Sequence, residues 1–123
     1  MIETTVTWSD IEPRTIIPGF SGRFAHSSTM TFALWEIEAG AVLPEHSHPH
    51  EQVIHVLEGE FEATVAGTTE VLGAGMVGIV LPHLRHSGRA LTRCRILDVF
   101  SPVREDYRGG GTTVIGDALT GKG

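Results

Sequence analysis

The chain of 123 residues is long enough to bury one hydrophobic core, and its 41% hydrophobic and 20% charged residues are typical of a globular domain rather than a disordered segment. A formal net charge of −6 argues against nucleic acid as a partner, and no apolar run approaches the roughly 18 residues that a membrane helix needs. The first residues do not combine a basic with an apolar segment, so we expect no secretory signal and a cytoplasmic location. Cys94 is the single cysteine, which excludes an internal disulfide and a cysteine-based metal site.

Strand signals follow one another along the chain, whereas no segment places apolar residues at helical spacing between caps. Short segments rich in Val, Ile, Phe and Trp, mostly separated by glycine or proline, predict strands at 30–38, 52–58, 60–66, 69–72, 76–81 and 94–100. Gly59 and the pair Ala66-Gly67 fall where tight turns would join consecutive strands. Short strands at this regular spacing predict an all-β sandwich or barrel.

The same pattern divides the chain into one domain and a tail. We expect residues 1–108 to form a single barrel with N-terminal strands, and the glycine-rich residues 109–123 to form a flexible tail. The segments VIHVL and RILDVF are apolar on both of their alternating faces. Because both faces must then be covered, one by the opposite sheet and the other by a second subunit, we expect a homodimer.

Histidines are concentrated in the stretch PEHSHPHEQ, residues 44–52. Residues two apart in a strand point to the same face, so His46 and His48 can approach one ion from one edge, and Gln52 has the same parity. A metal takes three or four protein ligands, which requires a distant partner. His86 follows a proline turn that could return the chain to face the first cluster, so these four residues form a predicted metal site.

The spacing of these residues resembles the two motifs of the cupin family. The pattern G-x5-H-x-H-x3-Q-x6-G at 40–59 resembles the first motif, in which glutamate usually stands at the position of Gln52, and G-x10-H at 75–86 resembles the second. The departures are Leu81 in place of a proline and Ala90 in place of an asparagine, and neither removes a ligand. The resemblance implies a double-stranded β-helix, or jelly-roll-like barrel, that is usually dimeric. It also implies one divalent transition metal, Ni, Mn, Zn or Fe, bound by His46, His48, Gln52 and His86.

A more specific resemblance is to the KdgF-type pectin-degradation cupins. It rests on HSHPHEQV, the VLEGEF turn and LDVFSPVREDY at 97–107, and it extends from about Trp8 to Tyr107. In that family the residues of D-x-F-x3-R are implicated in the active site, and they correspond to Asp98, Phe100 and Arg104. The resemblance implies ring opening and ketonisation of a 4,5-unsaturated monouronate, the product of pectin or alginate lyases, to a linear keto acid.

The residue types are compatible with that chemistry. A neutral amide at Gln52 leaves more positive charge on the ion, which strengthens it as a Lewis acid and attracts an anionic sugar. Asp98 lies in an apolar strand, where burial raises and a cation lowers its pKa, so it is the candidate acid or base. Arg104, expected at the mouth of the barrel, can hold a carboxylate by two hydrogen bonds, and Phe100 can form a wall against the sugar ring.

Several alternatives remain open from the sequence. Gln52 can hold a ligated water instead of the metal, and Asp98 can form a structural ion pair with Arg95 or Arg104. Two further arginines are rival binders of a carboxylate, Arg85 and Arg89. Two other functions also compete with the isomerase, namely a cupin dioxygenase that uses ferrous iron on another small acid and a module that binds an acidic sugar without turnover.

Overall fold

A computed structural model describes residue 2 and residues 4–108 of the chain. The predicted flexible tail, residues 109–123, lies outside the described residues. Within the described part no helix is long and apolar enough to cross a membrane.

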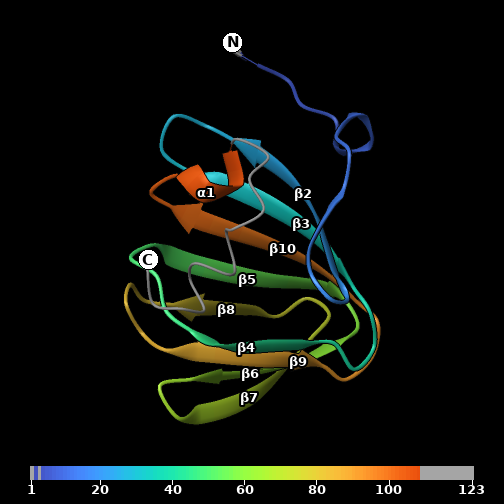
Figure 1. The fold of residues 1–123 in the computed structure, drawn as a ribbon, viewed down its shortest axis with the longest axis vertical. Helices are drawn as coiled ribbons and strands as arrows, with labels where there is room; N and C mark the ends of the chain where they lie inside the picture. Colours follow the sequence, from blue (N-terminus) through green and yellow to red (C-terminus); the bar gives the residue numbers. More distant parts are fainter. Residues whose placement is uncertain (1, 3, 109–123) are drawn as a thin grey trace.

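Two antiparallel sheets face each other and form the all-β, jelly-roll-like barrel that the sequence predicted (Figure 1). The larger sheet has the strand order β1 (Arg14–Ile17), β2 (Phe20–His26), β3 (Thr31–Ile37), β10 (Cys94–Ser101), β5 (Glu51–Glu58) and β8 (Val77–Val80). The smaller sheet has the order β4 (Val42–His46), β9 (His86–Ala90), β6 (Glu60–Val65) and β7 (Thr68–Gly73). Two short helical elements complete the described chain, a 3-10 turn at Trp8–Asp10 and α1 at Glu105–Arg108.

All six strands predicted by residue range are present, as β3, β5, β6, β7, β8 and β10. β1 and β2 were expected only as N-terminal strands without ranges. The ranges of β4 and β9 were not predicted, because VLPEH contains a proline and HSGRA has few apolar residues. Their pairing explains why they form: β9 is hydrogen-bonded on one side to β4 and on the other to β6. Neighbouring strands therefore impose an extended conformation that the local sequence does not favour.

Two turns between strands have the positive φ angles that their glycine-containing sequences predicted. Ala66 and Gly67, between β6 and β7, have positive φ angles of 47° and 84°. Two consecutive residues at positive φ are characteristic of a type I′ turn, whose twist matches that of a hairpin. Gly59, between β5 and β6, has a φ of 88°, and a Cβ at this position would collide with the backbone oxygen of Arg93.

At the end of the barrel where the chain enters α1, the core between the sheets is aromatic. Phe24 meets Trp35 edge to face, with 5.4 Å between ring centroids, and stacks on Tyr107 at 4.5 Å. Tyr107, from α1, is 1% exposed, so this short helix is held to the barrel by its aromatic side chain. Such aromatic pairs contribute beyond the area that they bury.

The register of the central strands decides which side chains point into the barrel. β10 lies between β3 and β5, with Asp98 opposite Ile54 and Phe100 opposite Gln52. Asp98, Phe100 and Gln52 are all buried, whereas the alternate residues of β10 point to the outer face. The predicted alternation of inward-pointing and outward-pointing side chains therefore holds along β10.

Candidate metal centre and active site

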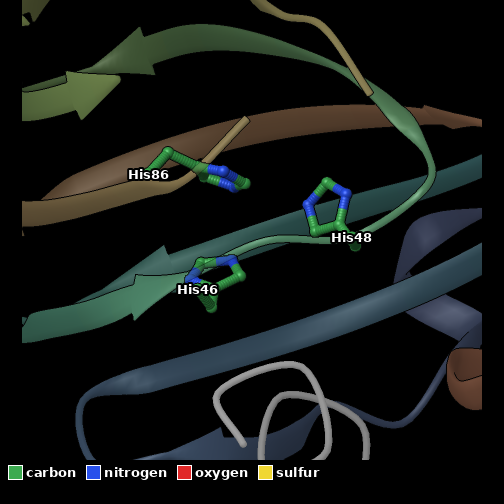
Figure 2. Close-up of side chains that lie close together, drawn as sticks. All are labelled: His46, His48 and His86. Atoms are coloured by element: carbon green, nitrogen blue, oxygen red, sulfur yellow. The ribbon is translucent and has the colours of Figure 1, made fainter. Parts of the chain in front are cut away.

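Three histidines, two from strands of the smaller sheet and one from a loop, converge on one point inside the barrel. His46 ends β4, His48 lies in the loop that follows, and His86 begins β9 (Figure 2). One ring nitrogen from each lies within 4.8 Å of the others, and each residue is 3% exposed. The sequence argument assigned His46 and His48 to one strand. That was wrong in detail, because β4 ends at His46 and a loop carries His48 to the same point.

The backbone sets the tautomer of all three rings. Each ring places Nδ1 next to a carbonyl oxygen, at 2.8 Å for His46 and Pro44, 3.0 Å for His48 and His50, and 2.9 Å for His86 and Leu84. A carbonyl oxygen can only accept, so in each case Nδ1–H is the donor. The lone pair then resides on Nε2, which is the arrangement that a metal-binding histidine requires.

Burial keeps these imidazoles neutral. Desolvation, with the charge of His86 next, lowers the pKa of His46 to about 4. Desolvation, with the charge of Arg104 next, lowers the pKa of His48 to about 3, and desolvation also lowers the pKa of His86. Among the described residues, Nε2 of His86 is buried without a hydrogen-bond partner. Three neutral rings with convergent lone pairs, one of them unsatisfied, fit a divalent cation such as Ni, Mn, Zn or Fe.

Gln52 extends the same donor set. Its Oε1 lies 3.1 Å from Nε2 of His48, and both atoms carry lone pairs once Nδ1 of His48 holds the proton. Two ligands at about 2.1 Å from one ion and at right angles to each other are about 3 Å apart. The spacing suits a shared cation better than a hydrogen bond, and it supports Gln52 as a fourth ligand, which stays a prediction.

Asp98 lies in the same cavity with one carboxylate oxygen held and one free. Trp35 donates its indole N–H to Oδ2 over 3.0 Å, whereas Oδ1 is buried without a partner among the described residues. Burial raises the pKa of Asp98 to about 7, against the nearby side chains of Gln52 and Trp35 and the charge of Arg104, all of which lower it. A carboxyl group with a pKa near neutrality is suited to accept and release a proton.

Arg104 does not stand at the mouth of the barrel as predicted. Its side chain is 2% exposed, and it donates from Nε and Nη2 to the two carboxylate oxygens of Asp106, at 3.2 and 2.7 Å. The guanidinium also packs over the rings of Phe100 and Tyr107, with its central carbon 4.9 and 4.3 Å from their centroids. The aromatic contacts draw it inward, because a guanidinium is weakly hydrated and stacks on rings.

The rival arginines lie elsewhere. Arg95 pairs with Glu36, Arg85 with Glu45 and Arg89 with Glu62, and all three side chains are at least two-fifths exposed. None of them lines the cavity that contains His46 and His86. Within the described residues Asp98 has no ion pair, so the alternative of a structural pair with Arg95 or Arg104 is not observed.

One cavity between the sheets brings together two of the three histidines with Gln52, Asp98 and Arg104. Its polar lining includes His46, Gln52, Ser87, His86, Asp98, Arg104 and Tyr107, and Phe100 and Trp35 contribute aromatic walls. Sequence reasoning missed Trp35, Asp106 and Tyr107. Asp106 and Tyr107 lie two and three residues after Arg104 in the REDY segment, so proximity to a named residue was the available signal.

The fold and the site together define a small all-β barrel with a buried three-histidine centre able to bind a metal ion. The family model described as Cupin domain matches residues 33–100, and the chain belongs to the cupin family. Its structure is similar to that of a KdgF protein. KdgF from Halomonas sp. is 26% identical with a TM-score of 0.81, over 86% of this chain and 99% of that one.

A second solved structure gives a similar result. An RmlC-like cupin from Shewanella frigidimarina is 32% identical, with a TM-score of 0.81, over 86% of this chain and 96% of that one. An oxalate decarboxylase from Bacillus subtilis is 20% identical over 79% of this chain and 29% of its own, with a TM-score of 0.70, and it shows the fold alone. No curated protein matches the chain.

Proposed function

We propose that this protein is a metal-dependent enzyme that opens and ketonises a 4,5-unsaturated monouronate. The observation that carries the proposal is Asp98, a buried carboxylate with one free oxygen beside a three-histidine centre and a buried arginine. The structural similarity to KdgF over most of both chains supports the same assignment.

The metal centre would be formed by His46, His48 and His86, with Gln52 as the fourth ligand. A divalent ion bound there would supply Lewis-acid stabilisation of negative charge on a sugar oxygen. The neutral Gln52 adds no negative charge to the site, which favours an anionic substrate. The reaction involves no redox change, so it does not demand a redox-active metal.

Asp98 provides the proton transfer. Its free Oδ1 takes the proton from the anomeric hydroxyl of the sugar, and the anomeric carbon becomes an aldehyde as its bond to the ring oxygen breaks. The ring oxygen leaves as the enolate oxygen on C5, and transfer of a proton to C4 converts the enolate to a ketone. One proton is removed and one is added, so the product is an isomer of the substrate.

Two residues orient the sugar. The guanidinium of Arg104 is the carboxylate-binding group, because it is the arginine in the cavity lining of the described chain. Phe100 is buried in the same lining and offers its ring as a wall. Holding the sugar between these groups sets the anomeric hydroxyl against Asp98, and such orientation lowers the entropic part of the barrier.

The test is an anaerobic assay of metal-loaded protein with a 4,5-unsaturated galacturonate monomer, following the ultraviolet absorbance of the conjugated double bond. We expect faster loss of absorbance than without protein, abolished by a chelator and by Asp98→Ala. Asp10→Ala, a change at an exposed aspartate that is not part of the cavity lining, is the matched control. Full activity of the Asp98→Ala variant with its metal retained would refute the role of Asp98.

The competing functions give different results in the same design. A dioxygenase consumes oxygen and depends on iron or another redox metal, so activity that requires air would favour it. A binding module would release heat on titration with the sugar but form no product. Turnover without oxygen therefore separates the proposed isomerase from both.

We also propose a homodimer formed through the outer face of the larger sheet. On β8 and the neighbouring β5, Val77 and Ile79 are 53% and 65% exposed, and Val53 pairs with Ile79. Leu57 and Leu81 add further exposed apolar surface. Exposed apolar side chains gathered on one sheet face indicate an interaction site. Light scattering should give a dimer for the wild type and a monomer for Ile79→Lys, and a monomeric wild type would refute the proposal.

A further inference from the structure

The guanidinium of Arg104 is engaged along one edge and free along the other. Nε and Nη2 donate to Oδ1 and Oδ2 of Asp106, which form the side-on, two-bond pairing of an arginine with a carboxylate. No hydrogen bond from Nη1 to a described residue is present, and Arg104 lines the cavity. The unengaged edge is therefore the part of the side chain available to a ligand.

Arg104 depends on Asp106 for its charge balance. The Arg104 side chain is 2% exposed, and a buried guanidinium without a counter-ion is strongly unfavourable. Asp106 supplies its ion pair within the described chain, whereas Asp98 acts on it only as a more distant charge in the same cavity. Without Asp106, Asp98 would be the carboxylate in the cavity lining that attracts the guanidinium.

The backbone on both sides of Asp106 is anchored, so its carboxylate is presented in one place. The N–H of Arg104 donates to the hydroxyl oxygen of Thr31 over 2.9 Å, and the N–H of Tyr107 donates to the carbonyl oxygen of Arg104 over 3.0 Å. Arg14 donates from Nη2 to the carbonyl oxygen of Tyr107 over 2.6 Å. Asp106 itself is 29% exposed, so the pair has one member in the core and one at the surface.

We propose that Asp106 is a positioning residue: it holds Arg104 by the Nε–Nη2 edge, so that Nη1 meets the carboxylate of the sugar and the guanidinium does not turn to Asp98. The inference rests on the proposed function, because it assigns Arg104 to the substrate carboxylate. A preorganised arginine loses less conformational freedom when the ligand binds, which strengthens binding. The rings of Phe100 and Tyr107 restrict the same group.

The experiment compares Asp106→Asn with Glu105→Gln. Both changes remove one carboxylate from α1 and keep its shape, but Glu105 is 72% exposed and pairs with Arg108. We expect Asp106→Asn to raise KM for the unsaturated uronate by about tenfold, the effect of losing one charged hydrogen bond, with a smaller change in kcat. Glu105→Gln should stay within about twofold of the wild type.

A binding measurement keeps the inference separate from the catalytic proposal. Calorimetry on metal-loaded protein would use galacturonate and its methyl ester, which has the same ring without the negative charge. Asp106→Asn should lose about tenfold in affinity for galacturonate and leave the ester unchanged. If the wild type binds galacturonate in preference to the ester but turns over no unsaturated uronate, the proposed reaction fails and the inference is still tested.

Asp106→Glu is a second variant for the case in which Asp106→Asn does not fold. It keeps the charge but has a longer side chain that displaces the guanidinium, so its galacturonate affinity should lie between those of the wild type and the asparagine variant. If the asparagine variant does not fold, weaker binding of galacturonate but not of the ester by Asp106→Glu supports the inference. Unchanged or tighter binding of galacturonate by Asp106→Asn, or a wild type that does not prefer galacturonate to the ester, would overturn it.

Discussion

Asp98→Asn should stabilise the metal-free protein at neutral and higher pH. Burial raises the pKa of Asp98 from 3.8 to about 7 in the folded state, so the folded protein binds this proton more tightly than the unfolded chain does. The free energy of unfolding of the wild type therefore falls as pH rises from about 4 to about 7. A shift of about three units at 1.36 kcal/mol each corresponds to about 4 kcal/mol, reached above the folded-state pKa.

Asparagine removes this penalty because it cannot ionise, and its amide oxygen can still accept the N–H of Trp35. The lowered pKa values of His46 and His48 act in the opposite direction, since folded stability is lost as pH falls below 6.5 toward about 4. These histidines are present in both proteins, so their effect largely cancels in the difference between variant and wild type. That difference should be small near pH 4 and grow in favour of the variant up to pH 8.

Urea unfolding of chelator-treated protein at several pH values provides the measurement, with Asp10→Asn as the control for replacement of an exposed aspartate. A difference between Asp98→Asn and wild type that does not increase with pH would show that Asp98 is not held in a desolvated state. A wild type that is the more stable protein at pH 8 would contradict the reasoning altogether. Loss of activity together with a gain in stability would mark Asp98 as a functional group maintained at a cost to the fold.

Three further outcomes follow from the same contacts. Trp35→Phe removes the donor that stabilises the Asp98 carboxylate, so the pKa of Asp98 should rise. The acid limb of the pH profile of kcat/KM should therefore move to higher pH by about 1 to 2 units, which is the equivalent of one hydrogen bond to a charged group. Gly59→Ala should lower the free energy of unfolding by about 1 to 3 kcal/mol more than Gly67→Ala does. Both glycines have positive φ, but only at Gly59 would the new Cβ collide with backbone atoms. Equal losses of stability in urea unfolding would refute this. His86→Ala should reduce metal affinity by roughly 100-fold or more while circular dichroism stays unchanged, and metal content after dialysis equal to that of the wild type would exclude His86 as a ligand.

The sequence was sufficient for features with a local physical signature. Alternating apolar residues identified β10, and their period of two placed Asp98 and Phe100 on the inner face, where both are buried. The glycine pattern identified the hairpin at Ala66-Gly67, because few residues adopt positive φ. The spacing of His46, His48 and His86 indicated the cluster that the structure assembles.

Tertiary structure decided the features that depend on residues far apart in sequence. Trp35 donates a hydrogen bond to Asp98, which lies 63 positions away in the sequence, and this contact exists because β3 and β10 are neighbours in one register. The same applies to β9, which is extended because it lies between β4 and β6. No local pattern specifies which strands become neighbours, since pairing reflects the packing of the whole chain.

The position of Arg104 shows most directly what the sequence determined and what only the fold decided. The sequence by itself determined that an arginine follows β10 near a candidate acid, and that its charge suits a carboxylate. Only the folded structure decided that the guanidinium is buried, stacked on aromatic rings and already paired with Asp106. The reason is that the cost of burying a charge depends on its surroundings in three dimensions, and those surroundings come from the packing of α1 against the barrel.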